Sequence, residues 1–282
     1  KIYCLCGDGC LMEGVCQESL SLAGSLQLDN FILIYDSNNI TIEGKTDITF
    51  VENTTKKFDA LGFDVVLVKD GNNVGAITKA LEKAKNCKRP CVVVVSTQIG
   101  YGTELVGSHK IHGKPLAADE LERLKLKLNV IKPNFDFSPD VKDALKQKSL
   151  NAKQRLKQQS CLEKYKAEYP KQWREIKQWI EGKTFEKEIE KIKKLKPIAA
   201  AETRDMNGEI LSQLSQIVPN LFGGSADVAT SSRAYVKTAK DFSKADYCGD
   251  LIRFGVREHA MCAICNGIAL FGLELPYQSC YL

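Results

Sequence analysis

Residues 2–39 read IYCLCGDGCLMEGVCQESLSLAGSLQLDNFILIYDSNN, and this stretch decides the fold. The apolar run over residues 2–6 predicts a buried strand, the periodic apolar positions over 11–28 predict a helix, and residues 31–35 predict a second strand. A strand, a helix and a strand in this order form a β-α-β unit, whose two strands lie parallel in one sheet. We therefore predict an α/β fold built on a parallel sheet.

The same alternation continues along the chain. A helix is predicted over residues 54–61, a strand over 65–68, a helix over 72–85 and a strand over 91–97. Parallel sheets carry helices on both faces, and their ligands bind beyond the carboxyl ends of the strands. The loops after Cys6, Tyr35 and Thr97 are therefore where a binding site is expected.

The length of 282 residues suggests two domains. From residue 119 to 196 there is no strand pattern, only a Lys-, Glu-, Gln- and Leu-rich stretch typical of helices. After Pro197 the pattern returns, with helices predicted over 203–217 and 257–271 and strands over 221–223 and 251–254. We predict a first domain over 1–125, a helical linker over 126–196 and a second domain over 197–282, and we expect a piece of a longer protein in which both domains are incomplete.

The composition narrows the class of protein. Apolar residues make up 44% of the chain and charged residues 27%, which is ordinary for a globular protein. No run reaches the roughly 18 to 20 apolar residues of a spanning helix, and no secretory leader opens the sequence, so a cytoplasmic protein without a membrane partner is expected. The net charge of +5 comes largely from residues 142–196, where acidic residues are interspersed, and this favours a solvated helix face over a nucleic-acid surface.

The eleven cysteines are expected to be reduced. Cys4, Cys6 and Cys91 lie in apolar runs, where a small buried thiol is the simplest interpretation. Cys262 and Cys265 form one CxxC pair, but no second pair accompanies it at the spacing of a zinc site.

Two polar motifs follow the first two strands. Gly7-Asp8-Gly9 comes after the first strand and Asn38-Asn39 after the next, with 28 residues between Gly9 and Asn38. The carboxylate of Asp8 and the amide carbonyl of Asn38 are oxygen ligands of the kind that Mg²⁺ prefers, and that Ca²⁺ also accepts. The glycines let the backbone approach a diphosphate closely, and a helix begins beside them. Either motif alone is usually a tight turn, but together they predict a metal-bound diphosphate.

The residues of these motifs resemble those of a known family. GDG followed after about thirty residues by Asn resembles the thiamine diphosphate signature, and GDGCLMEGVCQESLSLAG with YDSNNITIEG resembles the transketolase family in particular. The resemblance implies that thiamine diphosphate and Mg²⁺ are bound. In the family's pattern the metal ligands would be Asp8, Asn38 and the carbonyl of Ile40, and further cofactor contacts would come from Gly9, Glu13, Ile42 and Ile99. Glu13 and Glu18, expected at the start of one helix, would also lie at a subunit interface.

A histidine pair stands in GSHKIHG, residues 107–113. His109 and His112 are spaced as two metal ligands could be, but no third ligand is evident. The transketolase family carries a similar HxxHG after an IGYG segment, which matches residues 99–102 here. The resemblance implies that His112 touches both cofactor and substrate, and a histidine that is neutral near pH 7 suits proton transfer.

The second domain contains RFGVREHAM, residues 253–261, in which Glu258 opens a predicted helix. An acid at that position commonly only stabilises the helix. The run resembles the REHAM segment of the transketolase family, whose glutamate bonds N1′ of the aminopyrimidine, and this implies a catalytic Glu258.

Other parts of the second domain also resemble the family. GGSAD, residues 223–227, implies that Asp227 binds a substrate hydroxyl, although the Thr-Pro that usually follows reads Ala229-Thr230 here. Arg204 and Ser231 would contact a substrate phosphate, and Tyr281 would stack on the aminopyrimidine.

The resemblance implies an enzyme that reversibly transfers a two-carbon ketol group in the pentose phosphate pathway. The donor would be a ketose phosphate of the xylulose 5-phosphate type, and the acceptor an aldose phosphate of the ribose 5-phosphate type. The enzyme would be a homodimer with its active site across the interface, and the 282-residue piece alone is expected to be inactive. The alternatives are dihydroxyacetone synthase, deoxyxylulose-phosphate synthase and a non-catalytic relative, whereas the absence of GxGxxG after the first strand disfavours a dehydrogenase.

Overall fold

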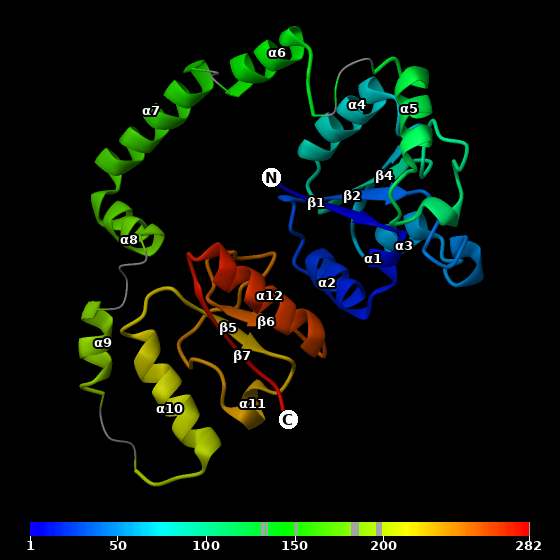
Figure 1. The fold of residues 1–282 in the computed structure, drawn as a ribbon. Helices are drawn as coiled ribbons and strands as arrows, with labels where there is room; N and C mark the ends of the chain where they lie inside the picture. The colour runs from blue at the N-terminus through cyan, green and yellow to red at the C-terminus, as the bar shows by residue number, and fades with distance from the viewer. Residues whose placement is uncertain (131–132, 134, 150–151, 182–185, 196–198, 282) are drawn as a thin grey trace. The chain divides into compact units, whose positions relative to one another are not determined.

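The computed structural model describes residues 1–130, 133, 135–149, 152–181, 186–195 and 199–281 (Figure 1). The chain divides into two compact units. One unit consists of residues 1–115 and 191–282, and it contains both sheets. The other consists of residues 116–190 and is helical wherever it is regular.

The first sheet has four strands, which are β1 (Ile2–Gly7), β2 (Phe31–Ser37), β3 (Asp64–Val68) and β4 (Cys91–Ser96). Their order is β1-β2-β4-β3, and every neighbouring pair is parallel. The register places Gly7 beside Asp36 and Ser37 beside Ser96, so these carboxyl ends meet at one edge of the sheet. The predicted parallel α/β sheet is confirmed.

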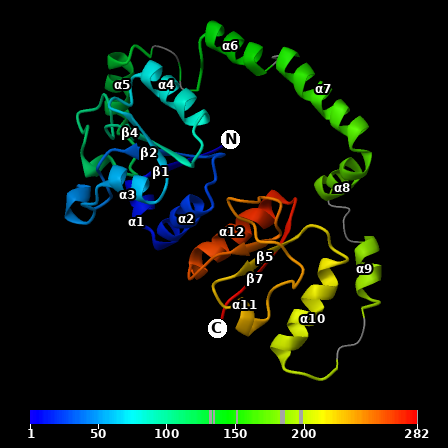
Figure 2. The same ribbon diagram turned by 180° about the vertical axis from the view of Figure 1, so that it is seen from behind.

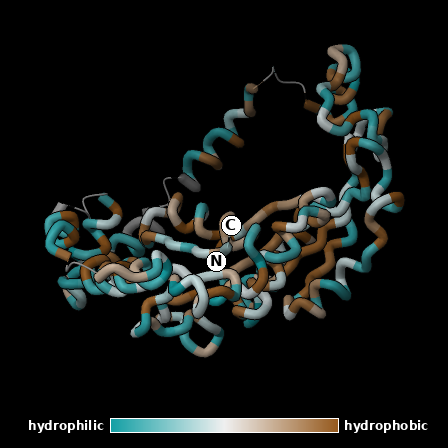
Figure 3. Tube along the Cα trace, turned by 90° about the horizontal axis from the view of Figure 1, so that it is seen from below, coloured by the Kyte–Doolittle hydropathy of each residue, from teal (hydrophilic) through white to brown (hydrophobic). Residues whose placement is uncertain are grey.

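Helices cover both faces of this sheet because its strands alternate between two apolar cores. Val92 and Val94 of β4 belong to the core beneath α1 (Asp8–Met12), α2 (Gly14–Ser25) and α3 (Thr54–Ala60). Val93 and Val95 belong to the opposite core, beneath α4 (Val74–Lys85). Hydrophobic and hydrophilic residues alternate along the helical parts of the trace in Figure 3, as expected of helices with one buried face.

Local signals set the helix boundaries. Asn53 and Asn73 cap α3 and α4 by accepting hydrogen bonds from the backbone amides of Lys56 (3.0 Å) and Ala76 (2.9 Å). The single helix predicted over residues 11–28 is wrong: α1 begins at Asp8, and Glu13, in an extended conformation (φ −65°, ψ 133°), separates it from α2. Glu13 is the N-cap residue of α2 and Glu18 lies near the start of the same helix, as expected.

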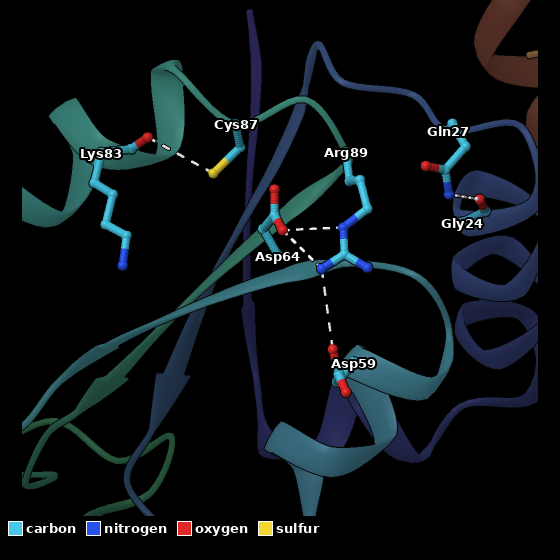
Figure 4. A network of polar contacts seen from close by, with 7 residues as sticks. All are labelled: Gly24, Gln27, Asp59, Asp64, Lys83, Cys87 and Arg89. Atoms are coloured by element: carbon cyan, nitrogen blue, oxygen red, sulfur yellow. Dashed lines mark hydrogen bonds and ion pairs between the residues drawn. The ribbon is translucent and has the colours of Figure 1, made fainter.

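An ion-pair network holds the edge of the first sheet at which β3 and β4 begin (Figure 4). The Nε and Nη2 atoms of Arg89 donate to Oδ1 of Asp64 at 3.0 and 2.7 Å, and Nη2 lies 4.0 Å from Asp59. The backbone amide of Asp64 donates to the carbonyl of Pro90 at 2.8 Å. This network ties the loop after α4 to the start of β3, at the edge opposite the carboxyl ends of the strands.

The second sheet has three strands, β5 (Leu221–Ser225), β6 (Leu251–Arg253) and β7 (Leu275–Ser279), in the order β6-β5-β7 and parallel throughout. The helices of this part are α10 (Thr203–Ser215), α11 (Ala229–Ser232) and α12 (Glu258–Phe271). A Cβ added to Gly223 would lie 2.0 Å from the carbonyl oxygen of Tyr277. The close packing of β5 against β7 therefore requires a glycine at position 223, the first residue of the GGSAD run, independently of any role in binding.

Helix α2 packs into two cores. Its residues Leu20 and Ala23 belong to the first sheet's core, whereas Leu22 lies in a cluster with Phe254 and Met261 of the second domain. Both ribbon views show α2 beside α12 (Figures 1 and 2). One helix thus contributes buried side chains to the hydrophobic cores of both sheets.

Polar contacts reinforce the same pairing of helices. Oε2 of Glu18 accepts a hydrogen bond from the backbone amide of Ala260 at 2.8 Å. Nη2 of Arg257 donates to the hydroxyl of Ser21 at 2.9 Å. The first turn of α12 is therefore hydrogen-bonded to α2.

The stretch predicted to be a helical linker, residues 126–196, contains α6 (Pro139–Ser149), α7 (Ala152–Glu168), α8 (Pro170–Ile180) and α9 (Glu186–Ile192). Helix α5 (Ala118–Lys127) begins in the predicted first domain and ends two residues into the predicted linker. Residues 131–132, 134, 150–151, 182–185 and 196 of that prediction lie outside the described residues. Nζ of Lys166 lies 5.0 Å from the ring centre of Trp173, which joins α7 to α8. Within the described part of the chain, no helix is both long enough and apolar enough to cross a membrane.

All eleven cysteines are free thiols. Cys6 and Cys91 are buried as predicted, and burial raises the pKa of each to about 12. Cys4 is exposed, contrary to prediction: β1 is an edge strand, and its first four residues are exposed on both faces.

Candidate functional site

The carboxylate of Asp8 lies at the carboxyl edge of the first sheet. Asp8 follows β1 directly and is only 3% exposed. Its Oδ1 accepts a hydrogen bond of 2.5 Å from the hydroxyl of Tyr35, and its Oδ2 accepts from the backbone amides of Asn38 (3.2 Å) and Asn39 (2.9 Å). Three donors from the second strand and its loop therefore fix the orientation of this carboxylate.

The loop that carries Asn38 is held by its own backbone. Asn39 adopts a left-handed conformation (φ 59°), which asparagine tolerates better than most residues. Its carbonyl accepts from the amide of Thr46 at 3.0 Å, and Oδ1 of Asn38 accepts from the amide of Ile40 at 2.9 Å. The structure thus brings together Asp8, Asn38 and Ile40, the three residues predicted to bind a metal.

The chemistry of this group fits a hard cation. Carboxylate, amide and backbone carbonyl oxygens are the ligands of Mg²⁺ and Ca²⁺. Each such oxygen offers two lone pairs, and the hydrogen bonds described above leave one free on Oδ1 of both Asp8 and Asn38. Burial and the hydrogen bond to Asp8 raise the pKa of Tyr35 above its usual range, so its hydroxyl remains a donor.

The glycines that flank Asp8 face open space. A Cβ added to Gly7 or Gly9 would meet no atom within 4 Å, whereas one added to Gly24 would lie 1.8 Å from the carbonyl oxygen of Leu61. Packing therefore requires Gly24 but does not require Gly9. The room beside Gly9 fits the close approach of a diphosphate.

The loop after β4 carries the residues predicted from the IGYG and HxxHG runs. The carbonyl of Ile99 accepts from the amide of Gly107 at 2.9 Å. His112 follows the 3₁₀ turn His109–Ile111, and its Nδ1 is buried without a hydrogen-bond partner in the described structure. A buried, unpaired ring nitrogen leaves His112 a hydrogen bond to offer a ligand. Ile42, predicted to contact the cofactor, is 72% exposed.

The predicted site residues of the second domain are more exposed. Glu258 is the first residue of α12 and is exposed, and Asp227 is exposed and left-handed (φ 62°) just after β5. Arg204, in the first turn of α10, forms an ion pair with Glu202. The hydroxyl of Ser231 on α11 donates to the carbonyl of Val228 at 3.2 Å, and Tyr281 is 62% exposed.

The structure assembles these residues only in part. Helices α10 and α11 are in contact, which places the helices of Arg204 and Ser231 together. Among the described residues, no hydrogen bond or ion pair joins Asp8 or Asn38 to Glu258. Hydrogen bonds thus connect Asp8 to the loop that carries Asn38 and Ile40 in the first domain, whereas no such network joins the predicted site residues described in the second domain.

Sequence reasoning missed the hydroxyl of Tyr35 and the amide of Asn39 as partners of Asp8. A signal for Tyr35 existed, because a polar-tipped side chain in a buried strand needs a hydrogen-bond partner at the strand end. The hydrogen bond between Glu18 and Ala260 joins residues that are 242 positions apart, and no local pattern could indicate it.

A parallel sheet with oxygen donors and open glycines at its carboxyl edge, followed by a second parallel sheet, defines a two-domain α/β protein of the cofactor-binding class. The sequence profile described as "Transketolase, thiamine diphosphate binding domain" matches residues 1–185, and "Transketolase, pyrimidine binding domain" matches residues 199–282. The chain belongs to the transketolase family.

Individual relatives agree with this assignment. The chain is 38% identical to the transketolase of Kluyveromyces lactis over 291 residues, covering 99% of this chain and 43% of the relative, and 38% identical to that of Bacillus subtilis, covering 96% and 41%. The solved transketolase of Leishmania mexicana superposes with a TM-score of 0.93 at 37% identity, covering 99% of this chain and 42% of that one. A Pichia stipitis transketolase in complex with sedoheptulose 7-phosphate gives a TM-score of 0.92. The chain spans less than half the length of these relatives.

Proposed function

We propose that the whole protein catalyses reversible transfer of a two-carbon ketol group from a ketose phosphate of the xylulose 5-phosphate type to an aldose phosphate of the ribose 5-phosphate type. Family membership supports this, as do the sugar phosphates named for the Pichia stipitis structures, which include sedoheptulose 7-phosphate and fructose 6-phosphate. The single observation that carries the proposal is the buried, hydrogen-bonded Asp8 beside Asn38 at the carboxyl edge of a parallel sheet. The reaction belongs to the pentose phosphate pathway.

The first domain holds the metal and the diphosphate. Asp8, Asn38 and the carbonyl of Ile40 bind Mg²⁺, which Ca²⁺ can replace because both are hard cations. The backbone at Gly9 lies against the diphosphate, as the open space beside it allows. Ile42 and Ile99 flank the thiazolium, which gives the exposed side chain of Ile42 an apolar partner.

Bound thiamine diphosphate supplies a nucleophilic carbon and an electron sink. Glu258 holds a proton at N1′ of the aminopyrimidine, and its exposure at the start of α12 leaves it able to reach a ligand. His112 moves a proton at the ketose hydroxyl or carbonyl, a role that its unpaired buried Nδ1 supports. Glu13 and Tyr281 complete the cofactor contacts.

The second domain binds the sugar phosphate. Arg204 binds the phosphate through its planar guanidinium, after exchanging its present partner Glu202, and the hydroxyl of Ser231 adds a donor. Asp227, exposed after β5, accepts from a sugar hydroxyl. Contact between α10 and α11 supports a shared phosphate site for Arg204 and Ser231.

The enzyme acts as a cytoplasmic homodimer in which Asp8 of one subunit and Glu258 of the other serve one active site. The resemblance to the transketolase family, in which one active site draws on both subunits, supports this arrangement. The 282 residues alone are inactive, because they cover less than half of the relatives.

A coupled assay of the complete gene product tests this proposal. Turnover of xylulose 5-phosphate with ribose 5-phosphate is expected only when both thiamine diphosphate and Mg²⁺ are present. Turnover of pyruvate with an aldehyde phosphate would instead indicate deoxyxylulose-phosphate synthase, and formaldehyde as the preferred acceptor would indicate dihydroxyacetone synthase. Cofactor binding without any turnover would favour a non-catalytic relative.

A further inference from the structure

We propose that Tyr35 is a positioning residue that sets the metal affinity of the site through Asp8. The inference rests on the metal site of the proposed function and assigns a role to a residue that supplies no ligand atom itself.

The backbone aims the Tyr35 side chain at Asp8. In the parallel register Tyr35 lies beside Cys6, and Asp8 follows two residues later at the same sheet edge. Tyr35 is 2% exposed, and its ring packs in the core that includes Leu11 and Phe58. A ring held on all sides cannot swing away, so its hydroxyl stays 2.5 Å from Oδ1 of Asp8.

The hydrogen bonds divide the two carboxylate oxygens unequally. Oδ2 of Asp8 accepts hydrogen bonds from two backbone amides, which use both of its lone pairs, whereas Oδ1 accepts a hydrogen bond only from the hydroxyl of Tyr35. The free lone pair of the carboxylate therefore lies on Oδ1, and a metal ion binds there while Tyr35 keeps its hydrogen bond. Tyr35 thus orients the ligating oxygen itself.

Removing the hydroxyl tests this role. The variant Tyr35→Phe keeps the buried ring and deletes the donor to Oδ1, together with the hydroxyl that the Ser37 side chain contacts. Loss of a hydrogen bond that orients a metal ligand typically weakens binding 10- to 100-fold, and we expect the dissociation constant for the metal to rise by about that factor. Mn²⁺ serves as the probe, titrated with thiamine diphosphate present and followed through the paramagnetic resonance signal of the free ion.

The matched control is Tyr277→Phe, which deletes another buried tyrosine hydroxyl, on β7. Its Mn²⁺ dissociation constant is expected to equal that of the wild type. A Tyr35→Phe variant with unchanged Mn²⁺ affinity would overturn the role of Tyr35, whereas a wild-type protein that binds no Mn²⁺ would overturn the metal site of the proposed function.

A double-mutant cycle separates positioning from a general structural effect. Asp8→Asn is expected to abolish most of the Mn²⁺ affinity, and adding Tyr35→Phe to it should change the remaining affinity by less than about twofold. An equal loss in both backgrounds would mean that Tyr35 acts on the fold rather than through Asp8.

The wild-type protein gives an independent readout if Tyr35→Phe does not fold. Metal binding at Oδ1 changes the electrostatic field at the hydroxyl that donates to it, so addition of Mg²⁺ is expected to produce a near-ultraviolet difference spectrum of tyrosine. The spectrum should vanish in Asp8→Asn and persist in Tyr277→Phe. A wild-type protein that binds Mg²⁺ without this spectral change would contradict the proposal.

Discussion

The two domains present their site residues in opposite ways. At the carboxyl edge of the first sheet, Asp8 is buried and accepts three hydrogen bonds from residues of the same domain. In the second domain, Glu258, Asp227 and Tyr281 are exposed. The first group is preorganised, because the donors that orient Asp8 belong to its own domain, whereas the side chains of the second group are accessible to a ligand.

This difference separates two kinds of contribution to function. Residues of the first group should affect both stability and metal affinity, since their contacts hold β1, β2 and the following loop together. Exposed residues of the second domain should affect the reaction and leave stability unchanged. Substitutions can test this division directly.

The largest expected effect is on catalysis, from Glu258→Gln. Loss of a proton-transferring carboxyl lowers kcat by about 10²- to 10⁴-fold. Because Glu258 is exposed, the free energy of unfolding should change by less than about 0.5 kcal/mol. The coupled assay and urea unfolding measure the two quantities, with Glu163→Gln on α7 as a surface control. A large loss of stability would contradict the expectation that exposed site residues of the second domain affect only the reaction.

The next effect is on stability, from Asp8→Ala. This change leaves the buried hydroxyl of Tyr35 and the amides of Asn38 and Asn39 without their acceptor. Buried donors left unpaired cost about 1–3 kcal/mol each, and water compensates in part, so we expect a loss of about 3 kcal/mol in the free energy of unfolding. Urea unfolding without metal measures it, and the exposed Asp47→Ala is the control. A loss no larger than that of Asp47→Ala would show that the group is not preorganised.

Two glycines of the first domain sharpen the comparison further. Gly24→Ala should lower the free energy of unfolding by about 1–3 kcal/mol, because its Cβ would collide with the backbone of Leu61. Gly9→Ala meets no atom and should leave stability unchanged or raise it by up to about 1 kcal/mol, because alanine favours a helix. Calorimetric titration should nevertheless show weaker thiamine diphosphate binding by Gly9→Ala. Unchanged cofactor affinity would remove Gly9 from the site.

The smallest effect is expected at the opposite edge of the first sheet. Arg89→Ala removes a half-exposed ion pair with Asp64 and should lower the free energy of unfolding by about 0.5–1 kcal/mol, with no change in metal affinity. The loss should shrink at high salt because screening weakens such pairs. Lys79→Ala on α4, also exposed, is the control for removal of a surface cation. A change in metal affinity would show that the two edges of the sheet are coupled.

The sequence predicted the parallel sheet and its site edge because both depend on short-range patterns. Apolar runs gave β1, β2 and β4 to within about one or two residues, the uncertainty normal for element ends. The break at Glu13 escaped prediction because the apolar period continues through it. Strand β7 also escaped, since Pro276 interrupts a short segment whose pairing with β5 depends on distant residues. The roles of Glu258 and Arg204 came only from family resemblance, because an exposed charge carries no structural signal of its own.

The two-sided packing of α2 has a consequence for synthesis on the ribosome. Leu22 lies in a core with Phe254 and Met261, which are made more than 230 residues later. At roughly 5–20 residues per second, that face of the helix waits on the order of ten to fifty seconds for its partners. During this interval the nascent chain displays an apolar helix face to which chaperones can bind.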